Sequence, residues 1–250
     1  MANLEFAYPV RTASERKRIV DGVFRSIARL LATFARFPRM NAQNISKWIR
    51  YEGLDHYTNA KKLGRGVLFA TAHMGNWELS AFAHALLTEP MNIVVRPLDN
   101  ASIDTLVERY RQSSGNRIIS KRDAARGILR ALRQNEAVGI LIDQNTTPAE
   151  GVFVDFFGRK ACAGAAFAKF AARSGAAVIP GFAIWSEVER RYVLRFYPPV
   201  LIEGDVLKDT QRIHAVLEGV IREHPEQWLW IHRRWKTRPE NEGTVEIAAG

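Results

Sequence analysis

The sequence predicts an α/β fold: a largely parallel central sheet flanked by helices, with an N-terminal helical pair. The first observation behind this prediction is that short apolar runs alternate with segments of helical periodicity from residue 66 onward. The second is that the first of these runs, GVLFATA at 66–72, is apolar throughout and bounded by glycine and polar residues, as in a buried strand. The third is the length of 250 residues, which suffices to bury a large core without disulfides or metals.

The first part of the chain is expected to be helical. Thr12 and Glu15 have the spacing of a capping box, and apolar residues recur behind them at helical intervals. These apolar residues are Val23, Phe24, Ile27, Leu30, Leu31 and Phe34. Pro38 ends this helix, and a second helix is expected over 42–52. The two helices could pack on the core or form a basic amphipathic surface on anionic lipid, and the sequence leaves both readings open.

The remaining elements follow in alternation. Strands are expected at 66–72, 91–96, 117–120, 137–142, 176–185 and 192–197, and the last of them can run antiparallel. Helices are expected at 77–87, 101–114, 123–133, 163–174 and 209–223. We expect one structural unit, with an N-terminal segment at 1–60, an α/β domain at 61–240 and a loose tail at 241–250. Because open α/β sheets bind ligands at the carboxyl ends of their strands, the loops after residues 72, 96 and 142 are expected at one functional edge.

Charge and cysteine content narrow the functional classes. Thirty-six Lys and Arg against 26 Asp and Glu give a net charge of +10, which favours nucleic acid, an anionic membrane or an acidic carrier protein as partner. The only cysteine, Cys162, excludes an intrachain disulfide and a multi-thiolate metal site, and its alanine neighbours predict a buried structural residue. No secretory signal is visible. The longest charge-free run, 174–186, is shorter than the approximately 20 apolar residues that a membrane span needs.

His73 is the candidate general base. It follows the first strand, Asn76 is placed to cap the next helix, and Glu78 falls in the first turn of that helix. The carboxylate of Glu78 is expected to hold one imidazole nitrogen while the other faces the cleft, so that His73 can deprotonate a hydroxyl, an effect of roughly 10²–10⁴ in rate. Gly75 and the N–H groups at the helix start could approach a substrate and receive an oxyanion. A Glu78 that only stabilises the helix start would have the same spacing.

The segment HMGNWE after GVLFATA resembles the signature of the late lipid A acyltransferases, a family of the lysophospholipid and glycerolipid acyltransferase group. The similarity continues at 96–100 (RPLDN), 143–144 (DQ), 151–158 (GVFVDFFG), 224–230 (HPEQWLW) and 233–236 (RRWK), and it covers about 8–239. It implies transfer of an acyl chain from an acyl-carrier-protein or coenzyme A thioester to a hydroxyl of a lipid. His73 and Glu78 would form the catalytic dyad, without a covalent acyl-enzyme, a further cofactor or a metal.

The acceptor and its binding residues are expectations of the same kind. A lipid A precursor is the first candidate, while a phosphatidylinositol mannoside or an aminolipid stays open. The candidate substrate-binding residues are Asn76, Arg96, Arg111, Asp143, Gln144 and Arg159. Arginines suit phosphate groups, although Arg96 and Arg111 could equally be solvated surface residues. Trp228 and Trp230 are expected to be core anchors.

Localisation and the competing functions follow from the same features. The family usually begins with a membrane-spanning helix, and this sequence starts just after the place where that helix would stand, which leaves open whether the anchor is naturally absent. Peripheral contact with the cytoplasmic face of the inner membrane is expected through the basic helix near 19–37. A thioesterase or lipase could use the same dyad, although no Gly-x-Ser-x-Gly elbow is present. A basic nucleic-acid-binding protein lacks support from any zinc-finger or RNA-reading signature. His-Glu-x-x-His and phosphate-binding glycine loops are absent as well.

Overall fold

The computed structural model describes residues 2–120 and 124–240. Within these residues, seven strands form one sheet in the order β1-β9-β8-β2-β5-β3-β4. The strands are β1 (Ile49–Glu52), β2 (Val67–Thr71), β3 (Asn92–Val95), β4 (Arg117–Ser120), β5 (Ala137–Leu141), β8 (Ala177–Ser186) and β9 (Arg191–Phe196). Only the pair β8–β9 is antiparallel among the pairs of this sheet that the structure describes. The predicted largely parallel sheet is therefore confirmed, including the reversed direction of its last strand.

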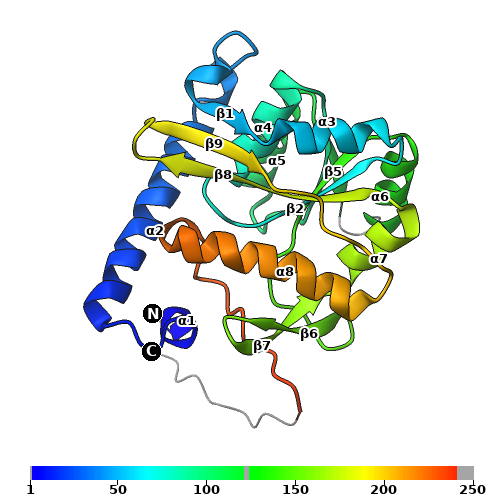
Figure 1. Cartoon of the computed structure of the whole chain (residues 1–250). Coiled ribbons are helices and arrows are strands. Elements are labelled where there is room, and N and C mark those ends of the chain that lie inside the picture. Colours follow the sequence, from blue (N-terminus) through cyan, green and yellow to red (C-terminus); the bar gives the residue numbers. More distant parts are fainter. Residues whose placement is uncertain (1, 121–123, 241–250) are drawn as a thin grey trace.

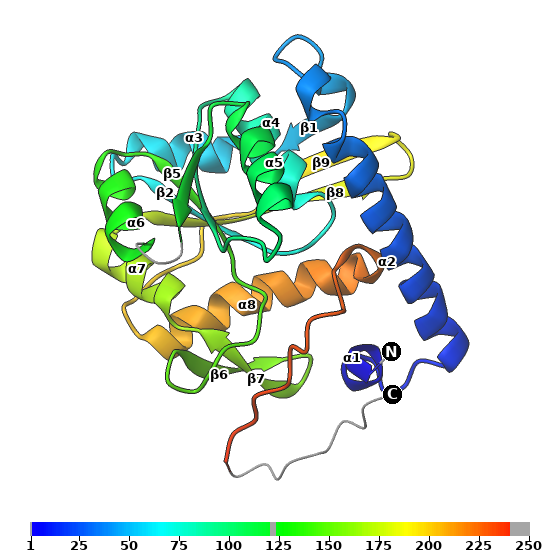
Figure 2. The same cartoon turned by 180° about the vertical axis from the view of Figure 1, so that it is seen from behind.

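Helices cover both faces of the sheet (Figures 1 and 2). They are α1 (Ala2–Ala7), α2 (Ala13–Phe34), α3 (Leu54–Lys62), α4 (Trp77–Leu87), α5 (Ala101–Gln112), α6 (Ala124–Arg133), α7 (Ala166–Ser174) and α8 (Val206–Glu223). Figure 1 shows α3 and α4 on one side of the sheet and α7 and α8 on the other. Strand β8 contributes side chains to the apolar clusters on both faces of the sheet, because successive side chains of a strand point to opposite faces. Ala183 packs with the α3–α4 side, whereas Phe182 and Ile184 pack with the α1–α2–α8 side.

Helix α2 begins as predicted. The Thr12 hydroxyl accepts a hydrogen bond from the Glu15 N–H, and the Glu15 carboxylate accepts one from the Thr12 N–H, which completes the capping box. One face of the helix is buried, whereas Phe24 and Leu31 on the outer face are 67% and 59% exposed. No helix within the described residues, α2 included, is long and apolar enough to cross a membrane.

The helix predicted at 42–52 is wrong. The chain forms two short 3₁₀ turns, at Phe37–Arg39 and Ile45–Lys47, followed by strand β1. Asn41 and Asn44 bond neighbouring backbone groups in place of a helical ladder: the Asn41 side chain accepts from the N–H groups of residues 43 and 44. The β-branched and aromatic residues that follow favour a strand, and Ile49 pairs with Tyr192 of β9.

A β-hairpin also lies outside the predicted elements. It consists of β6 (Gly151–Phe156) and β7 (Arg159–Gly164), so the helix predicted at 163–174 begins only at Ala166. The hairpin turns at Phe157 and Gly158, both with positive φ, as two-residue hairpin loops require. The sequence did not predict this turn because phenylalanine is not a residue type that indicates a left-handed backbone conformation. The predicted start of a helix at 123 and the predicted tail at 241–250 lie outside the described residues.

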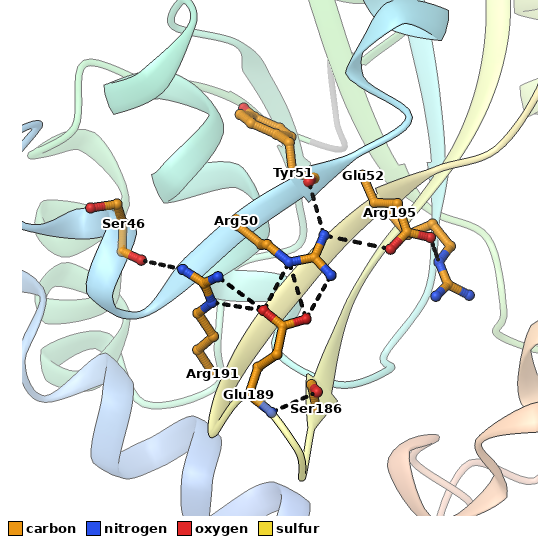
Figure 3. Close-up of polar contacts among 8 residues, drawn as sticks. All are labelled: Ser46, Arg50, Tyr51, Glu52, Ser186, Glu189, Arg191 and Arg195. Carbon is orange, nitrogen blue, oxygen red and sulfur yellow. Dashed lines mark hydrogen bonds and ion pairs between the residues drawn. The ribbon is translucent and has the colours of Figure 1, made fainter.

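A network of ion pairs fixes β1 and the β8–β9 turn (Figure 3). The Nε and Nη2 atoms of Arg50 donate to the Glu189 carboxylate at 2.6–3.1 Å, and Arg191 Nε donates to the same group at 3.0 Å. Glu52 bridges Arg50 and Arg195 at 3.5 and 2.7 Å. The two guanidinium groups hold the pKa of Glu189 at about 2. Ion pairs thus join strand β1 to a turn that lies 139 residues later in the sequence.

Candidate active site

The register of two neighbouring strands brings His73 and Asp143 together. In the parallel pair β2–β5, Thr71 lies opposite Leu141. His73 and Asp143 each stand two residues beyond this pair, at the carboxyl edge of the sheet where ligands bind in open α/β folds. The predicted functional edge is therefore the place where these two predicted site residues meet.

Asp143 is the carboxylate that holds the histidine. Its Oδ1 lies 2.9 Å from Nδ1 of His73, and its Oδ2 accepts from the His73 backbone N–H at 3.0 Å and from Trp228 Nε1 at 2.9 Å. Asp143 is fully buried, and burial by itself would raise its pKa, but the hydrogen bonds from His73 and Trp228 outweigh burial and the pKa is lowered. The side chain is therefore an ionised acceptor. Nδ1 of His73 must carry a proton, and Nε2 is the nitrogen with the free lone pair.

The expected contact between Glu78 and His73 is corrected by this geometry. The Glu78 carboxylate accepts from Nε and Nη2 of Arg111 at 2.9 and 2.6 Å and from Trp77 Nε1 at 3.2 Å, and no hydrogen bond joins it to His73. The reason is that Asp143 already occupies Nδ1, while the first turn of α4 directs Glu78 towards α5. The Glu78 and Arg111 side chains, 12% and 16% exposed, form a bidentate ion pair in the wall of the cavity described below.

The turn that carries His73 is fixed by backbone hydrogen bonds. Gly75 has φ +56°, and a Cβ atom there would stand 1.9 Å from the carbonyl oxygen of Ala183. Its N–H donates to the Gln227 carbonyl at 2.8 Å, and the Leu229 N–H donates to the His73 carbonyl at 2.9 Å. Gly75 was expected to let the backbone approach a substrate, but here the backbone approaches strand β8 closely instead, and the Gly75 N–H is already bonded to the Gln227 carbonyl.

Asn76 is a structural cap in this turn. It is fully buried, and its side chain accepts from the Leu79 N–H at 2.9 Å, as predicted for an N-cap. It does not belong to the described residues that line the cavity at His73. The predicted contact of Asn76 with substrate therefore has no counterpart in the geometry, because burial under the turn separates the side chain from the cavity.

A cavity of about 700 Å³ opens beside His73. Four further predicted site residues line it: Glu78, Arg96, Arg111 and Gln144. Its apolar wall includes Phe69, Ala81, Met91, Ile93, Val95, Ile140, Leu141, Leu194 and Phe196. Glycines provide part of the space, since a Cβ at Gly139 would lie 2.7 Å from the end of the Met91 side chain. The volume is typical of small-molecule sites, and the wall combines a long apolar surface with a few charged groups near one histidine.

The two remaining predicted arginines differ from each other. Arg96 lines the cavity, but its side chain is 75% exposed and pairs with Asp99 at 3.1 Å. Arg159 begins β7, and its guanidinium stands 4.0 Å from the ring centroid of Phe6 in α1. The prediction that Arg159 contacts the substrate is therefore not supported by its position, because cation–π packing directs it to the N-terminal helix. Cys162 is buried, as predicted.

His232 belongs to the same site and was missed. Its ring centroid lies 4.9 Å from that of His73. The predicted core anchors Trp228 and Trp230 are buried, and Trp228 in addition bonds Asp143. The available signal was a histidine in the segment WLWIHRRW. Because it is more than 150 residues from His73 in the sequence, no local pattern indicates that the two rings are in contact.

The arrangement suits proton transfer to and from a hydroxyl group. A neutral imidazole with one protonated nitrogen held by a buried carboxylate, and with the second nitrogen free, is the pattern of a general base. No group of three or more metal-ligating side chains occurs in residues 2–120 and 124–240.

Comparisons with known proteins identify a family for this chain. The sequence profile of the bacterial lipid A biosynthesis acyltransferase family matches residues 1–237. The chain is 31% identical to the lipid A biosynthesis palmitoleoyltransferase of Escherichia coli (strain K12), over 98% of this chain and 80% of that protein. It is 30% identical to the lauroyltransferase of the same strain, over 95% and 78% of the two chains. A lipid A biosynthesis acyltransferase of Haemophilus influenzae is 25% identical over 96% and 76%.

Proposed function

Because the chain belongs to the bacterial lipid A biosynthesis acyltransferase family and is an O-acyltransferase, we propose that His73 is the general base in acyl transfer from a thioester to a lipid A precursor. The observation that carries this proposal is the hydrogen bond between His73 Nδ1 and the buried carboxylate of Asp143. It leaves Nε2 basic, in a side chain that lines the cavity.

In the proposed reaction, Nε2 of His73 takes the proton of the acceptor hydroxyl while the oxygen of that hydroxyl attacks the thioester carbonyl carbon. A carbon–oxygen bond forms, the carbon–sulfur bond breaks, and the imidazolium returns the proton to the leaving thiolate. The products are an ester and a free thiol, and His73 ends neutral. Asp143 stabilises the imidazolium formed between the two steps. The attack is direct, without a covalent acyl-enzyme.

Charge and shape of the cavity support a lipid substrate with phosphate groups. The apolar wall can receive an acyl chain, and Arg111 and Arg96 stand on the same cavity as His73. Arg111 is kept in a fixed orientation by its two bonds to Glu78. We assign Glu78 the task of holding Arg111, whose guanidinium can bind a phosphate oxygen.

The donor is an acyl-carrier-protein or coenzyme A thioester. The net charge of +10 supports an acidic carrier protein. Helix α2 supports peripheral binding to the cytoplasmic face of the inner membrane, because Phe24 and Leu31 are exposed on it and the same helix carries the exposed Arg18 and Arg25.

A transfer assay tests this function. The purified chain is incubated with either thioester donor, with and without a lipid A precursor, and ester formation is measured by mass spectrometry. We expect ester only when the acceptor is present, and loss of at least about 10²-fold in rate for His73→Ala but not for the control His56→Ala on α3. Thioester hydrolysis that yields no ester would favour a thioesterase. Ester formation by His73→Ala at the wild-type rate would exclude His73 as the base.

A further inference from the structure

A second histidine ring, that of His232, lies against His73. The ring planes of His73 and His232 meet at 57° with centroids 4.9 Å apart, and the centroid of the Trp77 ring lies 5.2 Å from that of His73. Nε2 of His232 is buried and has no partner among the described residues. Burial, assisted by the neighbouring His73, lowers the pKa of His232. A ring that stays neutral is compatible with an imidazolium forming on His73, whereas a charged ring would oppose it.

The backbone that carries His232 is held from the opposite end of the chain. Nδ2 of Asn3, in α1, donates to the carbonyl oxygens of Trp230 and His232, both at 2.6 Å. Phe6 of the same helix packs on Trp235 with centroids 5.4 Å apart. Figure 2 shows the C-terminal segment, in red, descending between α1 and the β6–β7 hairpin. Backbone hydrogen bonds join this segment directly to the catalytic turn, from the Leu229 N–H to the His73 carbonyl and from the Gly75 N–H to the Gln227 carbonyl.

We propose that His232 is a positioning residue for His73 and that Asn3 holds it in place. The His232 ring keeps the His73 imidazole in the orientation in which Nδ1 bonds Asp143 and Nε2 faces the cavity. The inference rests on the proposed function only in naming His73 as the base. It assigns a structural task in the active site to α1, a helix that contributes no residue to the cavity lining among the described residues.

The absence of a partner for Nε2 of His232 in the described part of the chain indicates that this side chain positions His73 by ring packing and not by a hydrogen bond from this atom. If ring packing is what matters, the nitrogen can be replaced by carbon at little cost, because it makes no hydrogen bond that would be lost. Phenylalanine at position 232 should then preserve the contact with His73. Alanine should leave space beside the ring, and a displacement of about 1 Å in a reacting group can reduce the rate about 10²-fold.

Nuclear magnetic resonance of the full chain tests the proposal without requiring turnover. A proton on Nδ1 of His73 that is bonded to a buried carboxylate should give a downfield resonance, assigned by its loss in Asp143→Asn. We expect His232→Ala to broaden or remove this resonance through solvent exchange and to lower kcat about 10²-fold with KM little changed. His232→Phe should retain both the resonance and the turnover.

Asn3→Leu tests the second half of the proposal, with Glu5→Gln on the exposed side of α1 as its control. We expect Asn3→Leu to weaken the His73 resonance and Glu5→Gln to leave it unchanged. An unchanged resonance in both His232→Ala and Asn3→Leu would overturn the proposal, and a His232→Phe as inactive as His232→Ala would show that Nε2 has a chemical task instead. If His73→Ala keeps full activity, the proposed function fails, whereas the resonance still reports on ring position.

Discussion

At the scale of single residues, the central feature is the pairing of the candidate base His73 with Asp143, which lies 70 residues later in the chain. Asp143 fixes the protonated nitrogen of His73 and is itself fixed by Trp228. Asparagine has the same shape as Asp143 but no charge, so it would not stabilise the imidazolium. Its N–H group could donate to Nδ1 of His73, which would move the imidazole proton to Nε2.

We therefore expect Asp143→Asn to lower kcat by about 10²–10⁴ while KM changes little. The measurement is steady-state ester formation, with circular dichroism to verify folding. Asp155→Asn, on the exposed side of the hairpin, is a matched control that should have no effect. Turnover of Asp143→Asn equal to wild type would remove Asp143 from the mechanism.

The Glu78–Arg111 pair gives a second prediction at this scale. Removing one partner leaves the other charge in a largely buried place, where hydrogen bonds to charged groups contribute about 1.5–3 kcal/mol. Glu78→Leu and Arg111→Met should each lower the free energy of unfolding by about that amount, and the double variant should lose less than the sum. Denaturant titration of the four proteins measures the coupling. Additive losses would mean that the ion pair contributes no stability.

At the scale of elements, the sequence predicts those parts whose signals are local. The apolar runs became β2 and β5, and α4 has its predicted bounds because Asn76 marks its start. Strand register is not local, so the sequence predicts His73 and Asp143 as site residues but does not predict their contact. It favours Glu78, five residues along the chain, as the partner of His73. The contact between His73 and His232 depends on the path of the last segment, which no periodicity records.

The ion-pair network of β1 gives a prediction about pH. Glu189 has a pKa of about 2 in the folded protein, below the ordinary value near 4.5, because Arg50 and Arg191 donate to its carboxylate. A lowered pKa means that its stabilisation is complete above about pH 4.5 and disappears as the pH falls towards 2. The difference in unfolding free energy between wild type and Glu189→Gln should therefore be constant near neutrality and narrow below pH 4.5. Chemical denaturation at several pH values measures it, and a difference independent of pH would contradict the assignment.

At the scale of the whole molecule, charge and exposed apolar residues meet on α2. Arg18 and Arg25 are exposed on the same helix as Phe24. Each arginine near an anionic leaflet contributes about 1 kcal/mol, so Arg18→Gln with Arg25→Gln should weaken binding to anionic vesicles about 30-fold. Arg126→Gln with Arg173→Gln, on α6 and α7, removes the same charge from another surface and should weaken binding much less. Equal losses in a vesicle sedimentation assay would show that only net charge matters.

The pairing of β1 with β9 and of α1 with the segment after α8 has a consequence for biosynthesis. A ribosome releases the chain from its amino end, so the first strand of the sheet must wait for a partner that is translated more than 130 residues later. Trp228, which donates to Asp143, emerges later still. A nascent chain halted before this residue contains His73 and Asp143 without the indole that donates to Asp143. Such a chain has both side chains of the catalytic pair but lacks the hydrogen bond from Trp228 to Asp143, so we expect it to be inactive until residue 228 has been added and has packed against them.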